Sequence, residues 1–268
     1  MRIHPIRTGQ VRIRERMRRG VPGPARRAAL VTGPWTEPLP VLAWAIEHPE
    51  GLIVVDTGER AGVRDAPFAR FDLSPEEELG PGLRAAGLDP ADVRTVVLTH
   101  LHGDHMNGLG HLPGARVLVS AAEVRAAATP LARVIQRVTH QPLPEPFDPV
   151  ELTFDGPPAG AFARSHALTA AADVLVVPTP GHTPGHSSVL VVEGELHRLI
   201  AGDASYDEAQ LLARHVDAVS PSAKVALATM DTILRHAALH PTVYLPSHDP
   251  ASAARLAGDA VLRPAAAA

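Results

Sequence analysis

The segment His100-Leu101-His102-Gly103-Asp104-His105 places four potential metal ligands within six positions. It follows the apolar run at residues 95–99, so we expect a strand to end there and a loop to begin. Imidazole nitrogens and carboxylate oxygens are ligands that suit zinc, iron, manganese or cobalt. His100 and His102 would point to different sides of a helix, whereas a tight loop can bring them together. The segment therefore predicts a metal-binding loop.

Three further segments share one design, an apolar strand followed by a turn and then a His or an Asp. They are residues 179–186 with His182, residues 201–204 with Asp203, and residues 246–249 with His248. A strand fixes the direction of a ligand that follows it, which is how many metal sites are built. Together with the first segment they supply five histidines and two aspartates. That number suits two metal ions about 3.5–4 Å apart that share a bridging hydroxide.

The elements that must position these ligands are strands alternating with helices. Two strands at residues 41–46 and 52–55 read as a hairpin. A capping box from Ser120 to Glu123 predicts the start of a helix. Ser220-Pro221 predicts another helix, which runs to about His240. We expect the remaining helix at residues 76–86, and the other strands at residues 95–98, 116–119, 150–154, 173–177, 188–192, 196–200 and 243–245. This pattern favours a sandwich of sheets flanked by helices.

The bulk composition limits the classes of protein to which the chain can belong. It has 268 residues, which we interpret as one domain with an N-terminal arm or loop at 1–35 and a frayed tail at 262–268. The absence of cysteine excludes disulfides, thiolate metal sites and cysteine nucleophiles. The net charge of −4 argues against nucleic acid as a partner. No segment is typical of a membrane span or a signal peptide, so we expect a cytoplasmic protein that needs no membrane.

The pattern His-x-His-x-Asp-His, followed by Gly-His, Gly-Asp and a late His, resembles the metallo-β-lactamase superfamily over nearly the whole chain. The resemblance implies an α/β (α+β) fold, an αββα sandwich of two mixed β-sheets flanked by helices. The second half is most similar to N-acyl homoserine lactonases. The segments that carry this similarity are residues 180–187, 202–206 and 247–249.

The resemblance also implies a role for each ligand. One divalent ion would be held by His100, His102 and His182. The other would be held by Asp104, His105 and His248, with Asp203 bridging the two. Zinc is the expected metal, with cobalt, manganese and iron as alternatives. The main zinc class of true metallo-β-lactamases uses a cysteine in the second site, so β-lactam hydrolysis is not expected of this chain.

Two other residues receive roles that have competing interpretations. Asp56, in the segment Asp56-Thr57-Gly58, would hold a ligand histidine in one tautomer, or it could only cap a turn. Tyr206, three residues after Asp203, would stabilise an oxyanion, or it could only pack at the start of a helix. Asp104 would carry a proton to the leaving group.

The expected activity is the opening of lactone rings, most of all N-acyl homoserine lactones, by attack of a metal-bridging hydroxide. The alternatives on the same site are a thioesterase of the glyoxalase II kind and an aryl ester or phosphoester hydrolase. A redox module of the diiron flavoprotein kind would usually carry a flavodoxin-like domain after the metal domain, and we expect none here. The expected partner is a small lactone or ester substrate, and a homodimer is the expected assembly.

Overall fold

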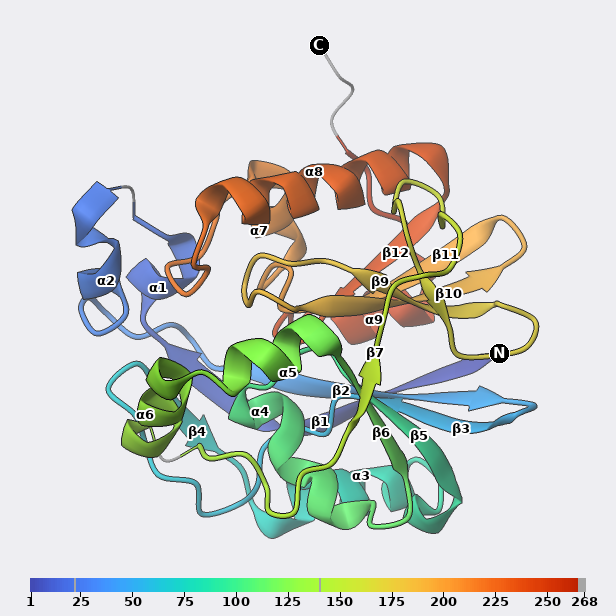
Figure 1. Ribbon diagram of the computed structural model, residues 1–268, viewed down its shortest axis with the longest axis horizontal. Coiled ribbons are helices and arrows are strands. Elements are labelled where there is room, and N and C mark those ends of the chain that lie inside the picture. The colour runs from blue at the N-terminus through green and yellow to red at the C-terminus, as the bar shows by residue number, and fades with distance from the viewer. Residues whose placement is uncertain (22, 140, 265–268) are drawn as a thin grey trace. The chain divides into compact units, whose positions relative to one another are not determined.

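The computed structural model describes residues 1–21, 23–139 and 141–264 (Figure 1). It divides into two compact units. Unit 1 comprises Met1–Arg14 and Trp35–Leu152, and unit 2 comprises Glu15–Pro34 and the residues from Thr153 onward. Across the described part of the chain, no helix combines the length and the hydropathy that a membrane crossing requires.

Unit 1 is built on a mixed sheet of seven strands. In spatial order these are β4 (Ala69–Asp72), β1 (Arg2–Ile13), β2 (Leu39–His48), β3 (Gly51–Val55), β5 (Val93–Leu98), β6 (Arg116–Ser120) and β7 (Val150–Leu152). The predicted hairpin is confirmed, because β2 and β3 pair antiparallel across a tight turn. Strands β3, β5, β6 and β7 run parallel. Their carboxyl ends therefore share one edge of the sheet, and the His100–His105 segment follows β5 at that edge.

The helices of unit 1 follow or cover these strands. They are α3 (Leu79–Ala85), α4 (Gly103–Met106), α5 (Ala121–Ala127) and α6 (Pro130–Val138), with 3-10 turns at Pro75–Glu77, Pro90–Asp92 and Asn107–His111. Leu79 and Leu83 of α3 are fully buried against Ala45, Val54 and Val96 of the sheet. Burial of these apolar side chains stabilises the seven-stranded sheet on this face.

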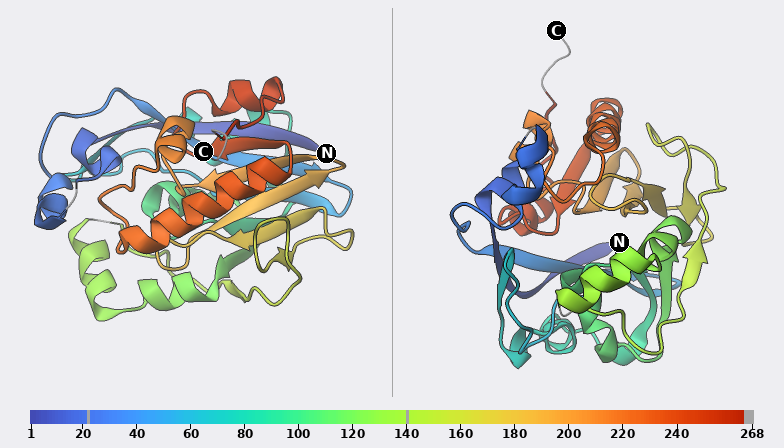
Figure 2. Two further views of the ribbon diagram at one scale, coloured as in Figure 1. Left: turned by 90° about the horizontal axis from the view of Figure 1, so that it is seen from above. Right: turned by 60° about the vertical axis from the view of Figure 1, so that its left-hand side comes forward.

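Unit 2 is built on a mixed sheet of five strands, in the spatial order β12 (Thr242–Pro246), β11 (Leu196–Gly202), β10 (Ser187–Glu193), β9 (Val174–Pro178) and β8 (His166–Ala167). The helices are α1 (Glu15–Arg19), α2 (Arg26–Ala29), α7 (Glu208–Ala213), α8 (Ala223–Leu239) and α9 (Ser252–Ala257), with a 3-10 turn at Gly23–Ala25. Helix α8 lies along one face of this sheet (Figures 1 and 2) and packs Met230 and Ile233 against Leu190 and Leu199. Asp203 and His248 come at the ends of the parallel pair β11 and β12.

Three predictions about local structure are corrected. Residues 1–35 are not an arm or loop throughout, because β1 pairs with both β2 and β4 inside the sheet. The sequence did not predict β1 because polar residues interrupt its apolar pattern. Its buried face is formed by Ile6, Val11 and Ile13. Ser120 precedes α5 without capping it. Helix α8 is capped by Ser222 rather than by Ser220.

His236 lies in α8 in a buried cluster of imidazole rings. Its Nε2 lies 2.9 Å from Nδ1 of His197, and its Nδ1 accepts the N–H of Ala161 at 3.3 Å. Burial, together with repulsion from His197 and His240, lowers the pKa of His236 from 6.5 to about 4. A histidine that stays neutral in the folded state makes the protein sensitive to acid.

We expect His236 to make the free energy of unfolding fall as the pH decreases from about 6.5 to about 4. In that window the unfolded chain binds a proton at position 236 and the folded protein does not, so protonation favours unfolding. A pKa difference of about 2.5 units corresponds to roughly 3 kcal/mol. Denaturant titrations between pH 7.5 and 4 on the wild type and on His236→Gln would measure this.

His215→Gln serves as the control for this prediction, because His215 is exposed. The control should follow the wild-type pH dependence, whereas His236→Gln should flatten it. Parallel curves for the wild type and His236→Gln would contradict the role of His236.

Candidate metal centre

Asp56 organises the His100–His105 segment in unit 1. It ends β3, and its carboxylate accepts the N–H of Thr99 at 2.8 Å, the Thr99 hydroxyl at 2.9 Å and Nδ1 of His105 at 2.8 Å. All three residues are buried. The bond to Nδ1 fixes the tautomer and the ring of His105, so its Nε2 is the nitrogen left to bind a metal. The structure therefore gives Asp56 contacts beyond those of a turn cap.

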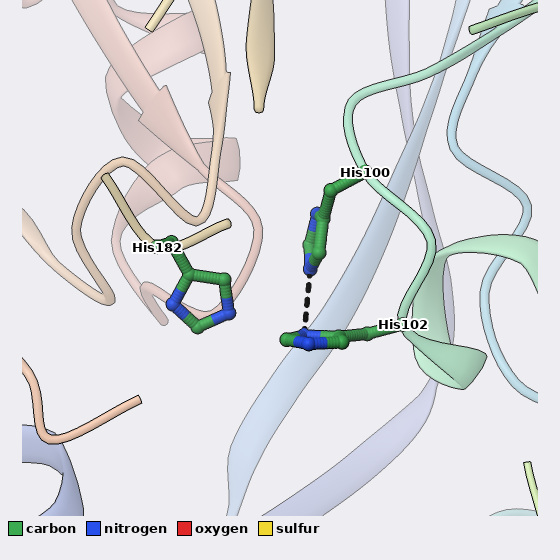
Figure 3. A group of neighbouring side chains, drawn as sticks. All are labelled: His100, His102 and His182. Carbon is green, nitrogen blue, oxygen red and sulfur yellow. Dashed lines mark hydrogen bonds between the residues drawn. The ribbon is translucent and has the colours of Figure 1, made fainter. Parts of the chain in front are cut away.

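The other side chains of this segment gather around His100. Its Nε2 forms a 2.9 Å hydrogen bond with Nδ1 of His102, and Figure 3 shows the two rings that meet there. The ring centroids of His100 and His105 lie 4.1 Å apart. Asp104 Oδ1 lies 4.0 Å from Nε2 of His105. The predicted loop is therefore only partly correct, because His100 and His102 precede α4 whereas Asp104 and His105 lie in it, and the two parts together group the four residues.

Two buried glutamates support the segment, and neither carried a metal-type signal in the sequence. Glu123 accepts the N–H of Leu101 at 3.2 Å, which accounts for its burial in place of a capping role. Glu59 accepts the side-chain amide of Asn107 at 2.6 Å. Burial raises the pKa of Glu59 to about 7, against the opposing hydrogen bonds from Arg60 N–H and Asn107.

The residues directly after the segment are packed into unit 1. Asn107 adopts a right-handed conformation, with φ −69°. Met106 is fully buried in the core of unit 1. Gly108 is required by a close approach, because a Cβ there would lie 2.0 Å from the carbonyl oxygen of Thr57. The turn is therefore set by the lack of a side chain at position 108.

In unit 2, the carboxylate of Asp203 lies between two imidazoles. Its Oδ2 is 3.4 Å from Nε2 of His182, and its Oδ1 is 3.4 Å from Nε2 of His248. All three side chains are buried. Each carboxylate oxygen therefore faces a different histidine, as a carboxylate that bridges two ions requires.

Asp217 supports His182 from behind and was not foreseen. Its Oδ2 lies 3.4 Å from Nδ1 of His182, and it accepts the Ser220 N–H at 2.7 Å and the Ser220 hydroxyl at 2.9 Å. Burial opposes the ionisation of Asp217, but His182 and the bonds from Ser220 outweigh it and lower the pKa of its carboxyl. The Asp217 carboxylate therefore lies beside Nδ1 of His182 in the same way that the Asp56 carboxylate lies beside Nδ1 of His105.

We expect Asp217→Asn to weaken zinc binding by about 10–100-fold, the usual cost of losing a carboxylate that orients a ligand histidine. The neutral amide would hold Nδ1 of His182 less firmly and make the ring a weaker ligand. Competition titrations with a chelator would measure the affinity. The control is Ser220→Ala, which removes one hydroxyl and leaves the carboxylate. Equal affinities for Asp217→Asn and the wild type would contradict this role.

Tyr206 packs against the two histidines that flank Asp203. The centroid of its ring lies 5.9 Å from that of His182 and 5.6 Å from that of His248. Its backbone N–H donates to Gln210 at 2.7 Å, and the side chain is buried. These contacts place the phenol beside the two candidate ligand side chains.

His186 has a structural role between two loops of unit 2. Its Nε2 accepts the N–H of Asp203 at 3.0 Å, and its Nδ1 lies 3.1 Å from the carbonyl oxygen of Thr179. The ring therefore joins the loop that carries His182 to the loop that carries Asp203.

The donor set of each unit fits a divalent metal ion. The chain offers imidazole nitrogen and carboxylate oxygen and no thiolate, a set that suits zinc and its first-row neighbours. In His105 and His182 a buried carboxylate lies beside Nδ1, so that Nε2 is the nitrogen suited to a metal (Figure 3 shows the ring of His182). This arrangement is common among histidines that bind metals.

Comparison with known proteins agrees with these features. A probable metallo-hydrolase of Mycobacterium tuberculosis is 34% identical over 178 residues, which cover 62% of this chain and 57% of that protein. An N-acyl homoserine lactonase of Agrobacterium fabrum is 27% identical over 222 residues, which cover 79% and 82% of the two chains. This chain thus spans a little over half the length of the mycobacterial relative.

The fold is also found among solved structures. An N-acyl homoserine lactone hydrolase with N-hexanoyl-L-homoserine bound at its metal centre superposes with a TM-score of 0.70 at 22% identity, and the match covers 92% of this chain and 93% of that one. The predicted class, two mixed β-sheets flanked by helices, is confirmed. The family model described as the metallo-beta-lactamase superfamily matches residues 36–248. With that match over most of its length, the chain belongs to the metallo-β-lactamase superfamily.

Proposed function

We propose that this protein is a metal-dependent hydrolase that opens lactone rings, with N-acyl homoserine lactones as the leading substrates. The observation that carries the proposal is the placement of Asp203 between His182 and His248, with Tyr206 packed against both rings. The similarity to proteins named N-acyl homoserine lactonases supports the choice of substrate.

The proposed site is binuclear. His100, His102 and His182 would hold one divalent ion. Asp104, His105 and His248 would hold the other, and Asp203 would give one oxygen to each. Zinc is the leading metal, and cobalt, manganese and iron share its preference for these donors. Bound ions would supply Lewis acidity and a water molecule that ionises near neutral pH.

The chain's own residues would act on the substrate in two places. The Tyr206 phenol would donate a hydrogen bond to the lactone carbonyl oxygen as negative charge develops on it. Asp104 would carry a proton to the ring oxygen as the ring opens, which gives a hydroxy acid. Asp56 and Asp217 would keep His105 and His182 in fixed orientations.

Metal analysis of the purified protein, combined with a substrate panel, tests this proposal. The panel would contain acyl homoserine lactones of several chain lengths together with S-lactoylglutathione, and proton release would be followed by the fall in pH. We expect about two equivalents of metal and faster turnover of lactones. Proton release from the thioester alone would indicate a glyoxalase II-like hydrolase instead. The homodimer, the cytoplasmic location and the absence of nucleic-acid and membrane partners stay predictions.

A further inference from the structure

Unit 1 contains a cavity of about 1000 Å³ whose mostly apolar walls carry an excess of arginine over acidic residues. The walls come from the loop at residues 60–64, from helices α5 and α6, and from the proline-rich segment at residues 142–149. Four arginines and a single carboxylate line it, namely Arg60, Arg64, Arg133, Arg137 and Glu145. The whole chain carries a net charge of −4, so this concentration of positive charge is a local property of the cavity.

Helix α6 has no buried residue, and its basic side borders the cavity. Arg133 and Arg137, one helical turn apart, line the cavity and are also exposed. The apolar side chains of the helix are 52–70% exposed, namely Leu131, Val134, Ile135 and Val138. A helix of a water-soluble domain usually buries its apolar stripe. Burial of apolar surface therefore does not explain why α6 lies with Arg133 and Arg137 at the border of the cavity.

Three of the four arginines of this cavity lack neutralising partners among the described residues, whereas Arg60 interacts electrostatically with Glu59. Among the residues that the structure describes, the guanidinium groups of Arg64, Arg133 and Arg137 have neither an ion pair nor a hydrogen bond. Guanidinium groups stay charged at every physiological pH. Several of them around one cavity repel one another, and a bound anion relieves that repulsion. The geometry and charge of guanidinium suit the two oxygens of a carboxylate.

The walls of the cavity are joined to the metal-binding segment at two points. Gln141 precedes the proline-rich wall, and its side-chain amide fills the space that Gly103 leaves open, 2.8 Å from where a Cβ would lie. Arg60 follows Glu59, which binds Asn107 just beyond the segment. The chain segments that form the cavity walls are therefore in contact, through Gln141 and Glu59, with Gly103 in the His100–His105 segment and with Asn107 just after it.

We propose that this cavity binds the carboxylate at the far end of an acyl group, so that the natural substrate is a lactone or ester whose acyl chain carries a negative charge. The inference rests on the proposed function for the reaction, and on the four arginines for the charge of the substrate. Neutral acyl lactones would be accepted with lower efficiency, because they leave the guanidinium groups without a partner.

The test compares two lactones that differ only at the end of the acyl chain, N-adipoyl-homoserine lactone and its terminal carboxamide. We expect kcat/KM of the wild type to be about tenfold higher for the carboxylate at low salt, as one charge-assisted hydrogen-bonded pair would give. The ratio should shrink at high ionic strength, because salt screens the partly open site. The variant Arg133→Gln/Arg137→Gln should bring the ratio to about one, because the carboxylate then loses its two guanidinium partners on α6.

The matched control is Arg84→Gln/Arg94→Gln, which removes the same charge from exposed positions of unit 1 outside the cavity. It should keep the tenfold preference. A ratio near one in the wild type, or a preference that survives Arg133→Gln/Arg137→Gln, overturns the inference. In either case, turnover of the carboxamide would still support the proposed function.

Calorimetry with adipate separates the anion site from the reaction. We expect adipate to bind the metal-loaded wild type about tenfold more tightly than it binds Arg133→Gln/Arg137→Gln. If adipate binds the wild type more tightly but neither lactone is hydrolysed, the proposed function is refuted and the anion site is still supported. Equal adipate affinities for the two proteins would overturn the anion site.

Discussion

Asp203→Asn is expected to lose bound metal and lactone turnover together. Each oxygen of Asp203 faces a different histidine. In asparagine one of these oxygens is replaced by an amide nitrogen, which cannot coordinate a metal ion. The loss of metal affinity should exceed the roughly 10–100-fold cost of removing a residue that only orients a ligand. Metal content by mass spectrometry and kcat/KM on a lactone would be measured on the same preparation.

The control for this variant is Asp231→Asn, an exposed aspartate of α8 that pairs with Arg214 at 2.6 Å. A surface ion pair contributes about 0–1 kcal/mol, so metal content and activity should stay at wild-type values. A fully metallated and active Asp203→Asn protein would refute the bridging role. A variant that keeps one equivalent of metal with little activity would still support it, because one ion would remain on the other ligands.

Tyr206→Phe is expected to lower kcat on lactones by about 10²–10³-fold, the usual cost of removing one donor to a developing oxyanion. The hydroxyl is the only part of the side chain that is lost, so the packing of the ring against His182 and His248 should remain. KM should change little, because the bond strengthens as charge develops on the carbonyl oxygen. Steady-state kinetics and metal content would be determined together.

Tyr244→Phe provides a matched control, since these are the two tyrosines of the chain. Tyr244 is fully buried in β12 and its hydroxyl forms a 2.8 Å bond with Ser205. Burial raises the pKa of the Tyr244 phenol well above its ordinary value, so it stays neutral. Its loss should cost about 1 kcal/mol of stability and leave kcat unchanged. Unchanged turnover by metallated Tyr206→Phe would remove Tyr206 from the mechanism.

Much of the fold could be predicted because local pattern and burial coincide in this chain. The expected strands at residues 95–98, 116–119 and 196–200 all lie in the sheets. Each of these apolar runs is short, is bounded by turn residues and forms a single strand of a sheet. Strand β1 was missed because charged residues on its exposed side interrupt the pattern. The Ser120 to Glu123 capping box failed because Glu123 is used by a tertiary contact with Leu101.

The sequence by itself determined which residues can bind metal, because imidazole and carboxylate chemistry is a property of residue type and strand ends can be read locally. Only the tertiary structure determined which residues orient the candidate ligands. Asp217 lies behind His182, although 35 positions separate them, and nothing in the short-range pattern links the two. The arginines of the cavity come from segments some seventy positions apart, so their shared positive field exists only in the folded chain. The chemistry of a single side chain can be read from the sequence. An electrostatic environment formed by several segments exists only after the chain has folded.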